Sequence, residues 1–526
     1  MSVERLRYGV PWGRETTKGE RPMSVERLRY CVDNEWRVSA TTKYMPVMNP
    51  SSGELIAEAA CCTQSEVDEA VAAAVRAFPG WSETPIPTRI QLMFRFKQLL
   101  DAHLDELTLL LATENGKVLS EARGDVLKAI EVVECACSTP YLMQGDTCMN
   151  VASGYDTVSY REPLGVFAAI APFNFPAMIP MGWMIPFAIT TGNTVVLKAA
   201  SLVPRTAMRM LELLIEAGLP KGVVNLVTCS RVEADSLLVH PAIKGVTFVG
   251  STTVGAHIYK TAAGAGKRVQ ALTEAKNHAL ALEDCVLERS VRGIINSTYG
   301  CAGQRCMALP VVCVQESIAD DFVALLKKFA QELKIGPAHL ASSQLGPVVS
   351  AGQKESIEKA IARGVAEGAE LVLDGRGVVV PGYENGYYLG PTIFDRVGPG
   401  QYVGDEEIFG PVTSIKRVKG FEDGLAIMNA NRFANGSCIY TTSGRYAREF
   451  VRRTDGGMVG INVGIPVPYS IFPFSGHKQS FFGDLHTLGK DGVAFFTETK
   501  SVTSVWFSEE DAKKKVSTWD GTLTRN

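Results

Sequence analysis

The chain has 526 residues, of which 46% are hydrophobic and 21% are charged, and its formal net charge is −3. This length predicts two or three domains with an ample core, and the composition is that of a globular protein. A net charge so close to zero argues against a nucleic-acid partner and against an anionic membrane surface.

The twelve cysteines and seven histidines are scattered along the chain. Without C-x-x-C or H-E-x-x-H patterns, they predict reduced thiols in a reducing compartment and no metal site. One stretch, 164–197, lacks charged residues and is longer than a membrane span, but four prolines interrupt it. Prolines at this density would break a spanning helix, so we expect buried strands and a core helix there, and no membrane segment.

The N-terminal region contains a direct repeat, because Met1–Tyr8 recurs unchanged at Met23–Tyr30. We interpret residues 1–22 as a duplicated, disordered leader and Met23 as the start of the functional chain. The leader holds arginines but also glutamates, unlike the acid-poor transit peptides of mitochondria. The prediction is therefore a cytoplasmic protein, with the mitochondrial matrix as the alternative.

Helices and strands then follow in chain order. Apolar residues at helical spacing predict helices within 64–78, 87–111 and 118–137. We interpret the strand region 147–161 as an arm. Strands are then expected at 166–171, 194–198, 223–227, 245–249 and 268–272. Because these strands are apolar throughout and alternate with helices, they predict a doubly wound parallel sheet. A second α/β series begins at Arg289, so two α/β domains are expected to share an interface.

The candidate nucleophile is Cys306, which ends the turn Gly303-Gln304-Arg305-Cys306. A helical stretch precedes this turn and a strand-like run, 309–314, follows it. Backbone N–H groups and a neighbouring cation favour the thiolate at such a junction, and the thiolate is the nucleophilic form. The alternative is a small buried hydrophobic residue.

Three further segments carry polar groups at the ends of predicted strands. Gly250 and Ser251 lie between a strand and a helix, where the helix N-terminus attracts a pyrophosphate; the alternative is an ordinary capped turn. Asn174, in an apolar loop, can donate to a developing oxyanion; the alternative is a structural asparagine. Glu407 can accept both hydroxyls of a ribose, or it belongs to a solvated acidic run.

Together these segments resemble the aldehyde dehydrogenase superfamily, from about Tyr44 to Phe507. The motifs that carry the resemblance are Pro172–Pro176, Lys198 after 194–197, Gly250–Gly255, Gly303–Cys306, Glu407–Val412 and Phe472–Gly476. The resemblance implies that Cys306 attacks an aldehyde and that Asn174, with the Cys306 N–H, holds the oxyanion. It implies the following cofactor contacts: Phe173, Lys198, Ser201, Gly250, Ser251, Glu407 and Phe409.

The same resemblance implies a domain organisation. Residues 23–146 and 163–283 would form the dinucleotide-binding domain, and 284–488 the catalytic domain. Residues 147–162 and 489–526 would form a small β oligomerisation arm and tail. Members of the family form homodimers and homotetramers through such an arm.

Within the superfamily, the chain resembles the CoA-acylating methylmalonate-semialdehyde dehydrogenases. The residues that carry this likeness are Ala171–Pro180, Ala275–His278, Gly303–Leu309, Gly483–His486 and Phe495–Lys500. The resemblance implies that Arg305 holds the substrate carboxylate. A second arginine of that branch is replaced in this chain by Lys128, which keeps the positive charge but cannot bind a carboxylate through two parallel N–H groups. The implied reaction converts methylmalonate or malonate semialdehyde to propionyl-CoA or acetyl-CoA, with loss of CO2 and reduction of NAD, in valine, thymine or inositol breakdown.

Four departures from family patterns bear on this reading. Hydrolytic members carry a glutamate base where this chain has Leu272, and the acylating branch carries glycine where it has Glu274. On a strand these two side chains would share a face about 6.6 Å apart, so Glu274 is a candidate displaced base. Ser201 replaces a glutamate that binds the adenosine ribose, which leaves NADP open. An additional residue near Gly182 predicts a bulged helix behind Asn174.

Two alternatives to the acylating reading therefore stay open. One is a hydrolytic NAD(P)-dependent aldehyde dehydrogenase that releases a free acid. The other is a non-catalytic cofactor-binding homologue, against which Cys306 and Asn174 speak.

Overall fold

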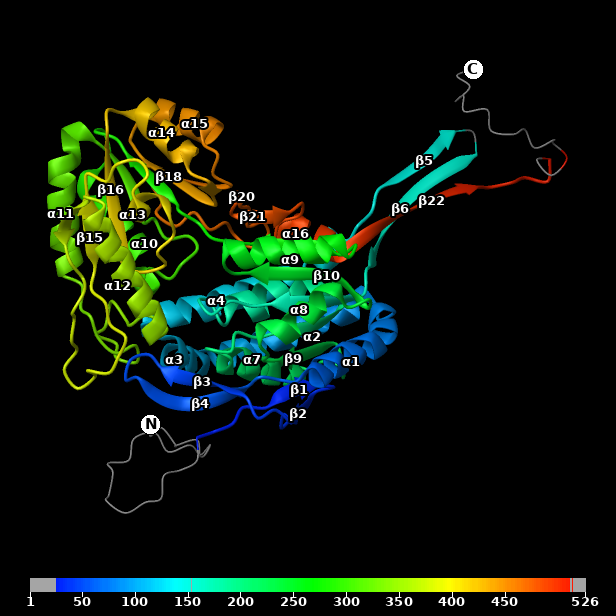
Figure 1. Cartoon of the computed structure of the whole chain (residues 1–526). Coiled ribbons are helices and arrows are strands. Elements are labelled where there is room, and N and C mark those ends of the chain that lie inside the picture. Colours follow the sequence, from blue (N-terminus) through cyan, green and yellow to red (C-terminus); the bar gives the residue numbers. More distant parts are fainter. Residues whose placement is uncertain (1–24, 153, 511–512, 514–526) are drawn as a thin grey trace, which may run out of the picture.

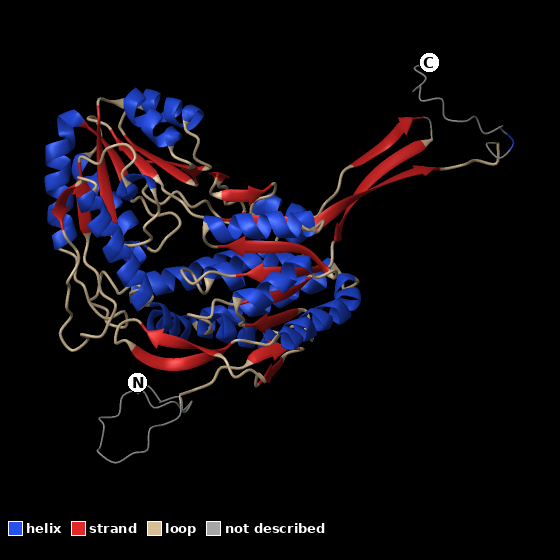
Figure 2. Cartoon of the chain, in the orientation of Figure 1, coloured by secondary structure: helices blue, strands red, loops and turns tan. Residues whose placement is uncertain are grey.

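Two α/β bodies and a projecting arm make up the chain (Figure 1). The computed structural model describes residues 25–152, 154–510 and 513, so the leader predicted at 1–22 lies outside the described residues. Each body has a sheet with helices on both faces, as Figure 2 shows. This is the predicted fold class of two doubly wound α/β domains.

The first sheet has eight strands in the order β2-β1-β9-β8-β7-β10-β11-β21. Its five inner strands, in the spatial order β9-β8-β7-β10-β11, run parallel to one another. The outer strands β1, β2 and β21 pair antiparallel with their neighbours. The strands are β1 Tyr30–Val32, β2 Glu35–Arg37, β7 Val166–Ile170, β8 Thr194–Lys198, β9 Val224–Val227, β10 Ile243–Val249, β11 Arg268–Leu272 and β21 Phe481–Gly483.

Alternate residues of the central strand β7 enter two different cores. Val166, Ala168 and Ile170 pack with one helical layer, whereas Phe167 and Ala169 pack with the other. All five are buried, and burying a side chain such as valine or phenylalanine contributes about 1.5–3 kcal/mol. Period-two alternation in a strand that is apolar throughout is what places helices on both faces.

The helices of this body divide between the two faces of its sheet. The first layer consists of α1 Gln64–Ser82, α8 Arg231–Val239 and α9 Thr252–Gly264. The second consists of α2 Ile86–Ala102, α3 Leu104–Asn115, α4 Leu119–Ala136, α5 Thr139–Leu142, α6 Pro186–Thr190, α7 Arg205–Glu216 and α16 Gly489–Phe496. The helix predicted to span 87–111 is in fact two helices, α2 and α3, because the chain turns at His103.

The second sheet has seven strands in the order β14-β15-β16-β13-β12-β18-β19, all parallel except β14. They are β12 His278–Ala281, β13 Val311–Gln315, β14 Glu370–Leu373, β15 Thr392–Asp395, β16 Val412–Val418, β18 Gly436–Tyr440 and β19 Met458–Ile461. The helices of this body are α10 Leu287–Tyr299, α11 Ala319–Gln331, α12 Ala351–Ala366, α13 Tyr402–Asp405, α14 Phe421–Ala430 and α15 Gly444–Arg453.

Two strands lie in the other body from the one predicted. Strand β12, expected in the dinucleotide-binding domain, pairs with β13 and β18 of the second sheet. Strand β21, expected in the catalytic domain, pairs with β11 at the edge of the first sheet. The alternation of strands and helices does not reveal which sheet a strand joins. The chain therefore crosses between the bodies within residues 273–277, directly after β11.

The arm is a three-stranded sheet in the order β22-β6-β5, which projects from the first body (Figure 1). Its strands are β5 Thr147–Ala152, β6 Tyr155–Pro163 and β22 Thr497–Val505. The two predicted arm segments, 147–162 and 489–526, thus contribute neighbouring strands, because β22 pairs with β6. No helix among the described residues is long and apolar enough to cross a membrane.

The additional residue near Gly182 is accommodated by a π-helix, η1, at Met178–Met184. A π turn holds one residue more than an α turn, which is how a helix absorbs a single insertion. Gly182 faces helix α4, and a Cβ atom there would lie 3.1 Å from the Cα of Ala129. The predicted bulge is confirmed, and glycine lets the two helices approach closely.

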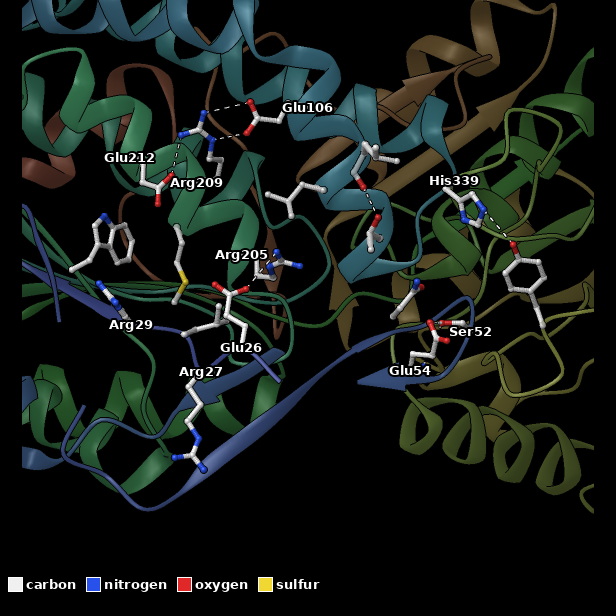
Figure 3. A pocket seen from close by; sticks show the side chains of 18 residues that line it. Glu26, Arg27, Arg29, Ser52, Glu54, Glu106, Arg205, Arg209, Glu212 and His339 are labelled. Carbon is white, nitrogen blue, oxygen red and sulfur yellow. Dashed lines mark hydrogen bonds and ion pairs between the residues drawn. The ribbon is translucent and has the colours of Figure 1, made fainter. Parts of the chain in front are cut away.

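Residues 25–30, the described part of the second copy of the repeat, belong to the fold. Leu28 donates its backbone N–H to the Glu58 carbonyl and is buried, and Tyr30 begins β1. Beside it lies a groove of about 1050 Å³, shown in Figure 3. Its arginines are largely neutralised, since Arg209 pairs with Glu106 at 2.6 Å and with Glu212 at 3.0 Å. None of the predicted site residues lines this groove.

Candidate active site

The nucleophile turn begins at the end of α10 with three consecutive residues in the left-handed region. Their φ angles are +52° at Cys301, +51° at Ala302 and +72° at Gly303. Such angles cost free energy at residues other than glycine, so neighbouring contacts must hold the turn. A Cβ atom on Gly303 would lie 2.1 Å from the Gly410 carbonyl oxygen, so only glycine lets this turn pack against the loop that follows Glu407.

Two asparagines fix the backbone of Cys306. The side-chain amides of Asn277 and Asn435 donate to its carbonyl oxygen at 2.8 and 3.1 Å. The thiol is partly exposed. Burial and the charge of Glu407 together raise the pKa of Cys306 to about 12, although the charges of Lys117 and Arg305 lower it. The thiol is therefore protonated at neutral pH in the chain alone, and activating it requires a change in its surroundings.

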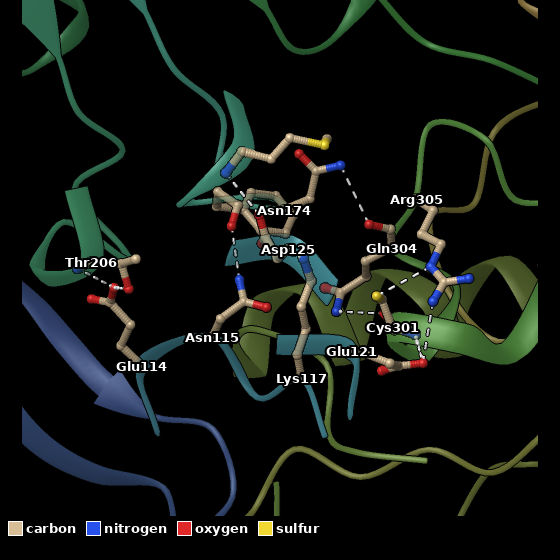
Figure 4. A network of polar contacts seen from close by, with 12 residues as sticks. Glu114, Asn115, Lys117, Glu121, Asp125, Asn174, Thr206, Cys301, Gln304 and Arg305 are labelled. Carbon is tan, nitrogen blue, oxygen red and sulfur yellow. Dashed lines mark hydrogen bonds and ion pairs between the residues drawn. The ribbon is translucent and has the colours of Figure 1, made fainter. Parts of the chain in front are cut away.

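Asn174 lies beside this turn, as predicted for an oxyanion donor. It is buried, and its amide nitrogen donates to the Gln304 carbonyl at 3.4 Å (Figure 4). The loop that carries it is held at both ends. Asn115 donates to the Phe173 carbonyl at 2.8 Å, and the Lys117 ammonium lies 3.5 Å from the ring centre of Phe175. Because Asn174 has two N–H donors, one remains for a substrate oxygen.

Glu407 and Phe409 enter the same region from the second body. Glu407 accepts the backbone N–H of Ala275 at 3.1 Å, in the segment where the chain crosses between the bodies. Burial and the charge of Glu274 raise the pKa of Glu407 to about 8. The rings of Phe409 and Phe173 meet edge to face, with centroids 5.8 Å apart. The two aromatic residues predicted to contact the cofactor thus come together across the interface.

The remaining predicted cofactor residues follow the carboxyl ends of parallel strands in the first sheet. Lys198 ends β8, and burial lowers its pKa. Ser201 follows it and is buried. Gly250 follows β10, where a Cβ atom would lie 2.4 Å from the Phe248 ring. Ser251 is the N-cap of α9 but makes no capping hydrogen bond with its side chain, so its hydroxyl is available to a ligand.

These groups fit a dinucleotide. In α/β sheets such ligands bind outside the carboxyl ends of the strands, with the pyrophosphate at a helix N-terminus. The Lys198 ammonium makes no hydrogen bond or ion pair with the part of the chain that the structure describes, and the Glu407 carboxylate has one backbone donor. A cation and a carboxylate with free positions suit the hydroxyl groups of ribose.

Glu274 does not lie as predicted. Strand β11 ends at Leu272, so the side chains of residues 272 and 274 are not fixed to one face by strand geometry. Leu272 is buried in the first core, whereas Glu274 is partly exposed in the crossing segment, close enough to Glu407 to raise its pKa. The reason is the crossover itself, because the strand ends at Leu272 and the chain leaves the first sheet from there.

Both cations predicted to bind substrate already carry carboxylate partners from helix α4. Arg305 contacts Glu121 at 3.3 Å, and Lys128 contacts Glu131 at 2.7 Å. Lys128 also donates to the Pro468 carbonyl at 3.2 Å, and Glu131 accepts the backbone N–H of Ser470 at 3.0 Å. Lys128 thus fastens a loop to α4, and no polar contact among the described residues joins it to Arg305.

A row of charged residues at 114–125, which was not predicted from the sequence, supports the site (Figure 4). Lys117 and Asp125 form a buried ion pair at 2.7 Å, and Asp125 also accepts the backbone N–H of Met178 at 2.8 Å. Glu114 accepts the backbone N–H groups of Arg205 and Thr206 at the start of α7. The sequence offered no clear signal for this row, because α3 ends at Asn115 and α4 begins at Leu119, so helical spacing does not run through all of these residues.

Lys276 was also missed, and its ammonium has no hydrogen-bond partner within the described residues. Burial lowers its pKa to about 7, while the charge of Glu407 raises it. No group of three or more metal-ligating side chains occurs in the described ranges. The contacts above bring Cys306, Asn174 and the candidate cofactor residues Phe173, Glu407 and Phe409 together where the two α/β bodies meet.

This fold and site are those of an aldehyde dehydrogenase. The profile of the aldehyde dehydrogenase family matches residues 36–502, and the chain belongs to that family.

Two relatives indicate which branch of the family this chain is similar to. The chain is 44% identical over 483 residues to the malonate-semialdehyde dehydrogenase of Bacillus cytotoxicus, an alignment that covers 92% of this chain and 99% of the relative. It is 46% identical over 482 residues to malonate-semialdehyde dehydrogenase 2 of Geobacillus kaustophilus, with the same coverage of 92% and 99%.

Solved structures agree with these relatives. The methylmalonate-semialdehyde dehydrogenase of Oceanimonas doudoroffii is 40% identical with a TM-score of 0.91, covering 93% of this chain and 100% of that one. A protein from Sinorhizobium meliloti, provisionally named methylmalonate-semialdehyde dehydrogenase and complexed with NAD, is 38% identical with a TM-score of 0.91, covering 93% and 99%. The predicted superfamily and branch are confirmed by these likenesses.

Proposed function

We propose that this protein oxidises malonate semialdehyde or methylmalonate semialdehyde with NAD and transfers the acyl group to coenzyme A, releasing CO2. The observation that carries the proposal is the largely buried side chain of Arg305 next to Cys306, in a chain whose relatives bear these substrate names. A guanidinium beside the nucleophile suits an aldehyde that carries a carboxylate.

In the first step the Cys306 thiol loses its proton to solvent, and the thiolate sulfur attacks the aldehyde carbon. The carbonyl oxygen becomes an oxyanion, which the free N–H of Asn174 and the Cys306 backbone N–H stabilise. Because the asparagine is uncharged and already held by Gln304, it needs little reorganisation as the charge develops.

The cofactor, when bound, supplies the hydride acceptor. Lys198 and Glu407 would hold its ribose, Ser251 and Gly250 its pyrophosphate, and Phe173 and Phe409 the side of its nicotinamide, with Ser201 near the adenosine ribose. The loss of hydride from the substrate carbon leaves a thioester on Cys306. Ser201 neither pairs with a 2′-hydroxyl as a carboxylate does nor repels a 2′-phosphate, so NADP is the second cofactor to assay.

The thioester then undergoes two successive steps, decarboxylation and transfer of the acyl group to coenzyme A. The substrate carboxylate lies β to the thioester carbonyl, so the bond to CO2 can break with its electron pair moving toward the carbonyl oxygen, and the carbon then takes a proton. The thiol sulfur of coenzyme A next attacks the thioester carbon and Cys306 leaves as the thiolate. No water-activating base is needed for this transfer.

The leucine at position 272 favours transfer of the acyl group to coenzyme A over hydrolysis. Leu272 is buried and cannot activate water, and Glu274 lies in the crossing segment beyond the strand. A hydrolytic NAD(P)-dependent enzyme remains the second candidate because Glu274 is a carboxylate near Glu407. A non-catalytic homologue is disfavoured by the arrangement of Cys306 and Asn174.

The test measures NADH or NADPH formation from methylmalonate semialdehyde and from propanal, with and without coenzyme A, and identifies the acyl product by mass spectrometry. We expect propionyl-CoA, NADH and CO2, with slow turnover when coenzyme A is omitted. Rapid formation of free acid without coenzyme A would replace the acylating proposal with the hydrolytic one.

We further propose assembly as a homodimer or homotetramer through the arm. The cytoplasmic location, with the mitochondrial matrix as alternative, stays a prediction from the sequence.

A further inference from the structure

The guanidinium of Arg305 is held in one pose by three acceptors. Its Nε donates to the Cys301 sulfur at 3.2 Å, and one terminal nitrogen contacts Glu121 at 3.3 Å (Figure 4). The other terminal nitrogen donates to the Asn296 carbonyl at 3.3 Å. It also packs over Gly300, where a Cβ atom would lie 2.5 Å from it. Its side chain is 13% exposed, and that of Glu121 is 14% exposed.

Glu121 does two separate things with one oxygen atom. Its Oε1 accepts the backbone N–H of Cys301 at 2.7 Å and also meets the Arg305 fork at 3.3 Å. The first contact holds the left-handed nucleophile turn, and the second neutralises Arg305. The neighbouring charges do not share this task, because Lys117 and Asp125 form a closed ion pair with each other at 2.7 Å.

We propose that Glu121 is a specificity-determining residue: an internal carboxylate on Arg305 with which the carboxylate of the substrate must compete. This inference rests on the proposed function, in which Arg305 receives that carboxylate. Glu121 would then set how strongly the enzyme favours aldehydes bearing a carboxylate over neutral ones.

The geometry leaves room for such competition. A guanidinium carries five N–H donors, and three have acceptors here, so terminal N–H groups remain for a second carboxylate. With Glu121 ionised, the arginine–glutamate pair has no net charge, and an arriving carboxylate meets both attraction and repulsion. With a neutral residue in its place, the same carboxylate would meet an uncompensated cation in a poorly hydrated site.

The substitution Glu121→Gln separates the two tasks. Glutamine keeps an oxygen that can accept the Cys301 N–H, so the turn stays held, but it removes the negative charge. Glu121→Ala removes both. Glu134→Gln is the matched control, since Glu134 lies on the same helix α4 and is exposed.

The experiment compares KM and kcat for methylmalonate semialdehyde and for propanal in the wild type and these three variants. We expect E121Q to lower KM for the semialdehyde roughly tenfold and to leave KM for propanal within about twofold. E121A should lower kcat for both aldehydes because the turn loses its anchor, and E134Q should match the wild type.

Two results would overturn the inference. One is an unchanged or higher semialdehyde KM in E121Q. The other is an equal loss of kcat on both aldehydes in E121Q and E121A, which would make Glu121 a purely structural anchor. The cycle with Arg305→Met adds a direct check, because the effect of E121Q must vanish when the guanidinium is absent.

A failure of the proposed function is distinguishable from a failure of this inference. If the wild type does not oxidise the semialdehyde, inhibition of propanal oxidation by 3-hydroxypropionate still measures how well the site binds a carboxylate. E121Q should then lower the inhibition constant of 3-hydroxypropionate roughly tenfold, and an unchanged constant would contradict the role given to Glu121.

Discussion

At the scale of single residues, Glu407 connects the cofactor side of the site to the nucleophile. Its pKa is raised to about 8 by burial and by Glu274, while its own charge raises the pKa of Cys306. The two titrations are therefore coupled: as Glu407 loses its proton near pH 8, Cys306 becomes harder to ionise. Cofactor ribose bound to the carboxylate would change both.

This coupling predicts the alkylation behaviour of the Glu407→Gln variant in the absence of cofactor. At pH 6 the wild-type carboxyl is protonated, so iodoacetamide should label Cys306 at equal rates in both enzymes. At pH 9 the wild type carries the negative charge and the variant does not, so the variant should react roughly three- to tenfold faster. Mass spectrometry of the Cys306 peptide measures the rate, and exposed Cys148 serves as the internal control. Equal rates at both pH values would contradict the coupling.

The placement of candidate residues was predictable from sequence where a local motif also shapes the loop that carries them. Cys306 and Asn174 were placed together correctly because each lies in a motif whose residues also shape its loop. The partner of Arg305 was not foreseen, since Glu121 lies 184 residues away and nothing near Arg305 points to it. The displaced-base reading of Glu274 depended on a strand that ends at Leu272, and strand ends are set by tertiary pairing.

At the scale of elements, the stretch from α3 to the π-helix η1 forms the support of the oxyanion loop. Asp125 accepts the backbone N–H of Met178 at the start of η1 and binds Lys117, which in turn covers the ring of Phe175. The bulge at η1 could be predicted from one additional residue near Gly182. The sheet membership of β12 and β21 could not, because it depends on where the chain crosses between bodies.

The variant Lys117→Met tests this support. It leaves the Asp125 carboxyl buried without its cation, which typically costs about 3–5 kcal/mol. Burial already raises the pKa of Asp125, and loss of Lys117 would raise it further. A carboxyl group whose pKa is raised by folding destabilises the folded state as the pH rises from the unfolded-state pKa to the folded-state pKa. The loss in Tm should therefore be larger at pH 8 than at pH 5.

The exposed pair Lys97–Asp101, with its 2.9 Å contact, provides the control. Lys97→Met should change stability by about 0.5 kcal/mol or less at either pH. K117M should also lower kcat, since the loop of Asn174 loses its neighbour. A Tm loss that is the same at both pH values would show that lost packing, rather than the buried charge, is responsible.

At the scale of the whole molecule, the arm carries apolar side chains that the rest of the chain does not cover. It exposes large apolar side chains on its strands and beyond, including Met149 at 79%, Tyr160 at 53%, Trp506 at 71% and Phe507 at 78%. A small sheet with apolar side chains and free edge strands gains stability by packing against another sheet or strand. The arm could be predicted from its alternating sequence, but its exposure is visible only in the structure.

The homo-oligomer proposal predicts a specific effect of charge on the arm. The double substitution Met149→Arg and Tyr160→Arg should shift the protein from dimer or tetramer toward smaller species in size-exclusion chromatography with light scattering at micromolar concentration. The reason is that two guanidinium groups would have to lose their hydration at the interface. Val379→Arg is the control, because Val379 is 67% exposed but lies in the second body, away from the arm. The far-UV circular dichroism of all variants should match the wild type, since none of these side chains is buried in the chain itself. A wild type that is monomeric under these conditions would overturn the proposal, and so would an arm variant that keeps the wild-type mass.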